Sequence, residues 1–139
     1  MPEPLRLLRQ TGWGDLLLLG PFAIPVVSAR LIDLLVWLNE YLGLPGAAET
    51  NALLYMLANV MGIFAVSSAV MRLRRPSVDW VYATVLVKFG AAGIILLAIS
   101  QQAPAILAVV AGADLLTATR LLISVTRHRW RPRPDPGPG

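Results

Sequence analysis

Five charged side chains lie well inside stretches of this chain that are otherwise almost entirely apolar, away from the ends of those stretches, and they are the residues best placed to do chemistry. They are Arg30, Asp33, Lys88, Asp114 and Arg120. A Lys, Arg or Asp at the middle of a membrane helix costs about 2.5–3.5 kcal/mol, whereas each Leu, Ile, Val or Phe returns only about 0.3–0.6 kcal/mol. We therefore expect these side chains to face the protein interior and to pair with one another, as residues on ion, proton or solute pathways do.

Lys88 and Asp114 are expected to form an ion pair. Lys88 belongs to the apolar segment 78–99 and Asp114 to the segment 104–125. With a helical rise of about 1.5 Å per residue, each lies about 15 Å from the start of its segment, which is the middle of a hydrocarbon core about 30 Å thick. The short connector Ser100–Ala103 predicts an antiparallel hairpin, which makes the two helices neighbours.

Three polar residues are expected to extend this pair into a network. Thr84 lies one turn from Lys88, Thr117 lies one turn from Asp114, and Asn59 of the segment 52–70 falls at a similar depth. Two interpretations stay open: a buried strut that fixes the register of the helices, and a proton or solute site. A buried ion pair is weak evidence for net stability, so the second interpretation is not excluded.

Arg30 and Asp33 are three residues apart, which places them on one face of a helix. They form either a pair that neutralises itself near the outer interface or an outward vestibule for a charged or polar ligand. Arg120 lies about a turn and a half from the end of its segment, so its long side chain is expected to reach the interface.

Motifs for catalysis or cofactor binding are not found in the sequence. The chain has no cysteine, its one histidine is His128 among arginines, and its glycines form no phosphate-binding loop. We expect no catalytic residue, no metal site and no cofactor. A membrane enzyme is the less favoured interpretation, because it would have to work with carboxylates, Lys88 or Tyr55 alone.

Composition and segment length predict what positions these residues. The chain of 139 residues is 56% hydrophobic and 14% charged, with a mean hydropathy of +0.65. A soluble domain of this size needs more charge to cover its surface. Four apolar stretches, each near the 20 residues that cross a bilayer, run over 16–38, 52–70, 78–99 and 104–125.

The predicted fold is therefore all-α: an integral membrane protein with four transmembrane helices in an antiparallel bundle. Residues 1–14 are expected as an interfacial lead, 15–126 as the transmembrane domain and 127–139 as an Arg/Pro-rich tail. Asp15 is interpreted as the N-terminal cap of the first span, and Pro21 and Pro25 favour a bend early in it. A cleavable signal peptide is the less favoured interpretation, because apolar residues continue through Leu38.

Arginine placement predicts the orientation. Two arginines precede the first span, three follow the second and four follow the fourth, while the other two connectors contain no arginine or lysine. By the positive-inside rule both termini should be cytoplasmic, in a bacterial inner membrane. The net charge of +4 then reflects contact with anionic lipid headgroups and not with nucleic acid. The headgroup-contacting residues are expected to be Arg72, Arg74, Arg75, Arg127, Arg129 and Arg131.

Small residues four apart, Ala58 with Gly62 and Ala108 with Gly112, predict close approach of neighbouring helices. Two functions follow as hypotheses. The first is an accessory, assembly or structural subunit of a larger membrane complex. The second is a small oligomeric transporter, or a bundle that binds lipid or another small ligand through its intramembrane charges.

Overall fold

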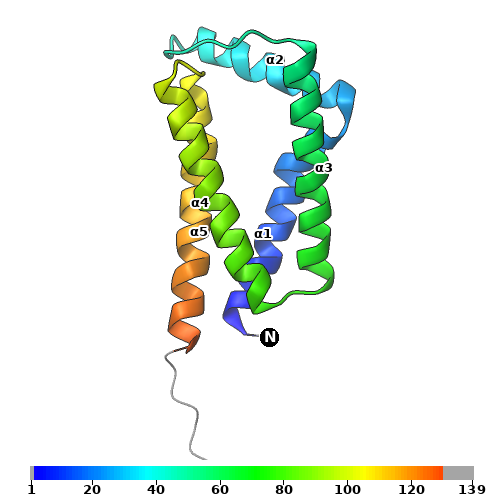
Figure 1. Ribbon diagram of the computed structural model, residues 1–139, viewed down its shortest axis with the longest axis vertical. Coiled ribbons are helices and arrows are strands. Elements are labelled where there is room, and N and C mark those ends of the chain that lie inside the picture. Colours follow the sequence, from blue (N-terminus) through cyan, green and yellow to red (C-terminus); the bar gives the residue numbers. More distant parts are fainter. Residues whose placement is uncertain (1, 130–139) are drawn as a thin grey trace, which may run out of the picture.

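The computed structural model describes residues 2–129, and these residues form helices and connectors with no strand (Figure 1). The α-helices are α1 (Glu3–Leu19), α2 (Pro25–Tyr41), α3 (Ala52–Arg74), α4 (Val78–Ser100) and α5 (Ala108–Arg129). Two short 3₁₀ helices, η1 (Gly20–Ala23) and η2 (Ala105–Leu107), lie between them.

Three of the helices are each long and apolar enough to cross a membrane: Ala52–Arg74, Val78–Ser100 and the combined helix Ala105–His128. The first part of the chain meets the same criterion only as a pair, Glu3–Ala23 with Pro25–Tyr41, whose two members are bent by 101°. The chain therefore has the helices of a membrane protein, with three or four candidate spans depending on how the bent pair is counted.

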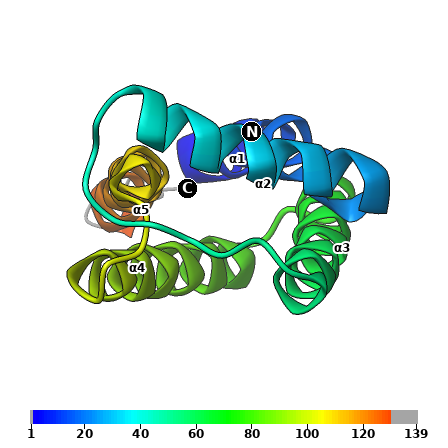
Figure 2. The same ribbon diagram turned by 90° about the horizontal axis from the view of Figure 1, so that it is seen from above.

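The span expected at 16–38 is not one continuous helix. Ile24 adopts an extended conformation, with φ −105° and ψ 113°, between η1 and α2. A residue that precedes proline disfavours the helical region, and Pro21 and Pro25 both lack the N–H that would continue the helical hydrogen bonds. The bend anticipated from the two prolines is therefore a complete change of direction, and α2 lies across the ends of the other helices (Figures 1 and 2).

Residues 3–14, expected as a lead outside the bundle, instead form most of α1. Leu8 is fully buried in a core cluster with Val81 and Val85 of α4 and Leu121 and Val125 of α5. This apolar cluster explains why residues 3–14 pack inside the bundle, because the buried face of α1 begins near its N-terminus.

The long helices pack as two pairs. α4 and α5 form the expected antiparallel hairpin, and α1 packs along α3, whereas α3 and α4 make little contact beyond the short connector between them. The pairs come together at the end that carries Arg6, Arg9, Arg74, Arg75 and Arg127, called here the arginine-rich end, and they diverge toward α2 (Figure 1).

Asn39 fastens the opposite end of the fold. Its side chain is 1% exposed, donates to the carbonyls of Leu44 and Gly46, and accepts from the backbone N–H of Ile106 at 3.0 Å. The connector after α2 is thereby tied to the start of the helix that leads into α5. This role of Asn39 was not predicted from the sequence.

Side chains cap two helices. Asn51 Oδ1 accepts from Leu54 N at the start of α3, and Ser77 Oγ accepts from Trp80 N at the start of α4. The cap predicted at Asp15 is wrong, because Asp15 lies within α1.

Gly62 marks a point where α3 closely approaches another part of the chain. A Cβ at this position would overlap the backbone of Phe22 and Ala23 in η1. The small-residue spacing predicted a close approach here, and the partner is the 3₁₀ turn. At Gly112, by contrast, a Cβ would meet open space.

Gly62→Ala is expected to destabilise the fold by about 1–3 kcal/mol, because the added methyl group overlaps backbone atoms that cannot rotate away. The measurement is the midpoint of thermal unfolding in detergent. Gly93→Ala is the matched control, since a Cβ there meets nothing within 4 Å, and its midpoint should stay unchanged or rise. A Gly62→Ala midpoint at or above the wild-type value would contradict the close approach.

Candidate functional site

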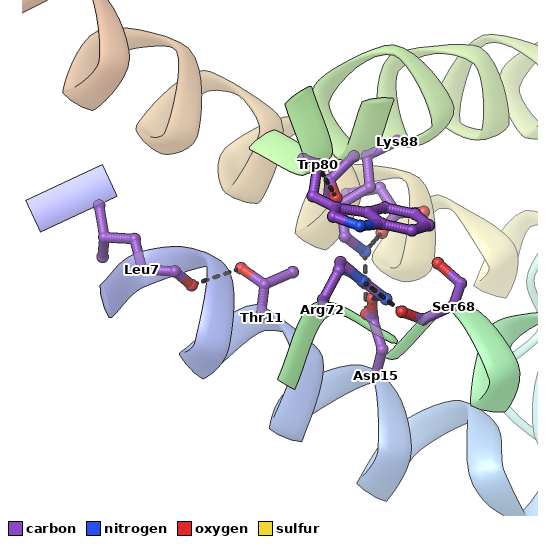
Figure 3. A network of polar contacts seen from close by, with 9 residues as sticks. Leu7, Thr11, Asp15, Ser68, Arg72, Trp80 and Lys88 are labelled. Atoms are coloured by element: carbon purple, nitrogen blue, oxygen red, sulfur yellow. Dashed lines mark hydrogen bonds and ion pairs between the residues drawn. The ribbon is translucent and has the colours of Figure 1, made fainter. Parts of the chain in front are cut away.

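A chain of ion pairs joins four helices in the interior of the protein (Figure 3). Arg72 Nη2 lies 2.7 Å from Asp15 Oδ2, Lys88 Nζ lies 3.0 Å from Asp15 Oδ1, and Lys88 Nζ lies 2.6 Å from Asp114 Oδ1. We call these four residues the charge network. Two carboxylates and two cations make its formal charge zero.

Helix geometry brings the four side chains together. Asp15 comes from α1 and Arg72 from α3, which form one helix pair, and Lys88 and Asp114 come from α4 and α5, which form the other. The contact between Asp15 and Lys88 is therefore the polar link between the two pairs. Arg72 is fixed further by donating from Nε to the carbonyl of Ser68 on its own helix.

The network is largely shielded by protein. The side chain of Arg72 is 4% exposed, Lys88 10%, Asp15 12% and Asp114 18%. Charges removed from water this far are stabilised only when opposite charges and hydrogen bonds accompany them, and each of the four has such a partner within 3.0 Å.

The ion pair expected between Lys88 and Asp114 is present, whereas Asn59 is not part of the network. Asn59 Oδ1 lies 3.0 Å from the hydroxyl of Ser28, and its amide donates to the carbonyl of Tyr55. The depth estimate could not find this arrangement, because α3 packs on α1, η1 and α2 and not on the hairpin that carries Lys88.

The two threonines lie beside the network without bonding to it. Thr84 is buried and donates to the carbonyl of Trp80, and Thr117 donates to the carbonyl of Ala113. Both hydroxyl groups therefore bond to the preceding turn of their own helix, which is the usual behaviour of threonine within a helix.

Within the described residues, the expected ion pair between Arg30 and Asp33 is absent. Both side chains are exposed on α2, and Asp33 accepts a hydrogen bond of 2.6 Å from the hydroxyl of Tyr55 on α3. The turn at Pro25 is the cause, because it lays α2 across the start of α3.

Arg72 also departs from its expected role. It was grouped with the headgroup-contacting arginines, yet it is 3% exposed and bound to Asp15. Arg74, Arg75 and Arg127 are exposed at the arginine-rich end, and their contact with headgroups stays a prediction. Arg131 lies outside the described residues, and so does the side chain of Arg129.

Sequence reasoning missed Asp15 because an acidic residue just before an apolar run resembles a helix cap. A signal was available: Asp15 is followed by apolar residues and preceded by Leu5 and Leu8 at helical spacing, which is typical of a helix that begins earlier.

A groove of about 680 Å³ runs along the charge network, between α1, α2 and α5. All the polar side chains of the groove wall lie in the half of the groove nearer the arginine-rich end. They are Gln10, Thr11, Asp15, Lys88, Asp114, Thr117 and Arg120. Leu7 and Leu121 lie among them.

Toward α2 the same groove is lined by apolar residues alone. They include Leu17, Leu18, Phe22, Leu34, Leu35, Val109 and Val110. The volume falls in the range of about 300–1,000 Å³ that is typical of small-ligand sites. One end of the groove is thus suited to a polar group and the other to a hydrocarbon chain.

A second, smaller cavity of about 240 Å³ lies at the arginine-rich end, lined by Pro2, Glu3, Ser124, Arg127 and His128. Ser124 Oγ is buried and has no hydrogen-bond partner among the described residues. His128, the one histidine of the chain, is exposed at this cavity.

Comparison of the chain with protein-family models, with curated proteins and with solved structures finds no match. Any conclusion about function therefore has to come from the geometry of the charge network and the groove.

The charge network predicts which of its two carboxylates contributes more to the stability of the fold. Asp15→Asn should destabilise the protein most, by about 3–5 kcal/mol, because it leaves the buried cation of Arg72 without its anion and cuts the link between the helix pairs. Asp114→Asn should cost less, since Lys88 keeps Asp15. The measurement is thermal unfolding in detergent.

Asp33→Asn is the control, because Asp33 is an exposed acid outside the network. Its unfolding midpoint should stay near that of the wild type. A larger loss for Asp114→Asn than for Asp15→Asn would show that Asp15 is not the central member of the network.

Proposed function

We propose that this protein is a non-enzymatic membrane protein that binds a lipid-like amphiphile in the groove between α1, α2 and α5. The observation that carries the proposal is the division of the groove wall into a polar half and an apolar half. A molecule with one polar head and one hydrocarbon chain matches both halves at once, because the hydrocarbon gains from leaving polar surroundings and the head finds hydrogen-bonding groups.

A membrane location is supported by the apolar side chains that the fold leaves uncovered. Outside the groove, Trp13, Phe64, Leu86, Ile94 and Ile123 are each between 44% and 74% exposed. They lie on four different helices, so the exposed apolar surface surrounds the bundle. Surfaces of this extent do not face water in soluble monomers, whereas lipid tails would cover them.

We infer four crossings, made by α1 with η1, α3, α4 and α5, with α2 lying flat along the opposite interface. The stacked rings of Trp37 and Tyr41 on α2, with centroids 5.2 Å apart, suit a headgroup layer, where aromatic residues gather. The arginine-rich end then faces the cytoplasm of a bacterial cell, and the protein resides in the inner membrane.

Ligand binding is favoured over catalysis by the state of the charged groups. Asp15, Lys88 and Asp114 all line the groove, yet each is held by an opposite charge within 3.0 Å. Side chains that are already bound to one another in this way can line a binding site. Proton transfer from one of them to a substrate would break the ion pairs that link the two helix pairs.

An accessory or structural subunit is the second candidate function, and the closed charge network favours it. A neutral, shielded set of ion pairs that joins two helix pairs is what a strut requires. A transmembrane segment of another subunit, or of a second copy of this chain, would then fill the groove in place of an amphiphile.

The topology can be tested with single cysteines, since the chain contains none. A cysteine in place of Glu49, in the connector after α2, should react with a membrane-impermeant maleimide added to intact bacteria. A cysteine in place of Arg74 should react only after the membrane is opened. The reverse pattern would contradict the proposed orientation, and reaction of both in intact cells would contradict the proposed crossings.

The groove itself can be tested by filling it. Gly14 lines the groove, and a Cβ there meets nothing within 4 Å, so Gly14→Trp should place an indole in the space that a lipid chain would occupy. Native mass spectrometry of protein released from phospholipid nanodiscs should show bound lipid on the wild type and a loss of most of it on Gly14→Trp.

Gly93→Trp is the matched control, because Gly93 faces open space on α4 away from the groove. It should keep the lipid. Equal retention by the wild type and both variants would contradict binding in the groove and would favour a partner subunit as its occupant.

A further inference from the structure

One charged side chain that lines the groove, Arg120, is left without an opposite charge within the described residues. The charge network, which includes Arg72 behind the groove wall, sums to zero. Arg120 also lines the groove, is exposed, and makes no ion pair or hydrogen bond within residues 2–129. The groove therefore carries one positive charge that the described protein leaves uncompensated.

Arg120 stands in the polar half of the groove, on the α5 side. It is six residues nearer the arginine-rich end than Asp114, which is about 9 Å along the helix axis. A group bound by its guanidinium would lie between the charge network and that end of the bundle, at the depth where a long arginine side chain meets the headgroup layer.

The hydrogen-bonding groups around Arg120 favour an acceptor as ligand. The hydroxyl groups of Thr11 and Thr117 already donate to the carbonyls of Leu7 and Ala113. The guanidinium of Arg120 and the side-chain amide of Gln10 retain free N–H groups among the described residues. Arginine presents its N–H groups as a planar fork that matches two oxygens of a phosphate.

A zwitterionic headgroup finds no complement here. Its ammonium or trimethylammonium would need a carboxylate, and both carboxylates of the groove, Asp15 and Asp114, are already bound to cations within 3.0 Å. The one unpaired charge at the groove is the guanidinium of Arg120, so an anion is the ligand that neutralises it.

We propose that the groove selects an anionic phospholipid, whose phosphate is bound by Arg120 while one acyl chain follows the groove toward α2. The inference rests on the proposed function and adds the headgroup chemistry. The phospholipid of the surrounding leaflet is the source, because the groove lies beside helices whose outer faces are apolar and its polar half is at the arginine-rich end.

Nanodiscs that contain equal amounts of phosphatidylglycerol and phosphatidylcholine with identical acyl chains provide the test. Lipid that stays with the protein on release is counted by native mass spectrometry. The wild type should retain phosphatidylglycerol in about fivefold excess, the preference expected for one basic residue acting on an anionic lipid. Arg120→Gln should keep its bound lipid but lose this excess.

Arg74→Gln is the control, since Arg74 is an exposed arginine at the same end of the bundle that does not line the groove. It should keep the wild-type excess. Arg120→Lys should keep part of it, because an ammonium retains the charge without the fork. Should Arg120→Gln fail to fold, the comparison of Arg120→Lys with the wild type decides.

The outcomes separate the two proposals. If the wild type retains no lipid, the proposed function fails and this inference fails with it. If the wild type retains lipid in the composition of the nanodisc, the groove binds an amphiphile but does not select its headgroup. If Arg74→Gln removes the excess as fully as Arg120→Gln, the preference belongs to the general surface charge, and the assignment to Arg120 is overturned.

Discussion

A carboxylate in the middle of a helix cannot remain charged among apolar neighbours without opposite charges, and the arrangement of this fold follows from how Asp15 meets that constraint. One of its oxygens binds Arg72 and the other binds Lys88, at 2.7 and 3.0 Å. Because Arg72 belongs to the pair of α1 with α3, and Lys88 to the hairpin of α4 with α5, the same carboxylate that is stabilised also holds the two pairs together. The core around Leu8 reinforces this junction with apolar contact at the arginine-rich end.

The divergence of the helix pairs away from this junction accounts for the groove. The junction lies near the middle of α4, where Lys88 is ten residues after Val78 and twelve before Ser100. The turn at Pro25 sends α2 across the end opposite the arginine-rich end instead of into the space between the pairs. The wall is polar where the junction supplies charges and apolar where only Leu, Val and Phe remain. A single cause, the position of the charge network along the bundle, therefore sets both the shape of the groove and the chemistry of its two halves.

The network also explains why the intramembrane charges divide into two kinds. Asp15, Arg72, Lys88 and Asp114 are bound to one another and stabilise the fold, whereas Arg120 is left free at the groove. Arg30 and Asp33 fall in neither group, because the direction of α2 places them on the surface near the start of α3. The amphiphile proposal depends on this separation between charges that are committed to the fold and one that is available to a ligand.

The helical class, apolar segments over 52–70, 78–99 and 104–125 and the pairing of Lys88 with Asp114 could be predicted from the sequence, because helix periodicity and a short hairpin connector fix relative depth along neighbouring helices. The structure has apolar helices over 52–74, 78–100 and 105–128 at these places. How the other helices pack on one another followed only from the tertiary structure. Depth is a one-dimensional measure, so it could not tell that Asn59 faces Ser28 or that Arg72 turns inward to meet Asp15. The groove also depends on tertiary structure, since its wall is assembled from α1, η1, α2, α5 and Lys88 of α4, whose arrangement in space no sequence periodicity records.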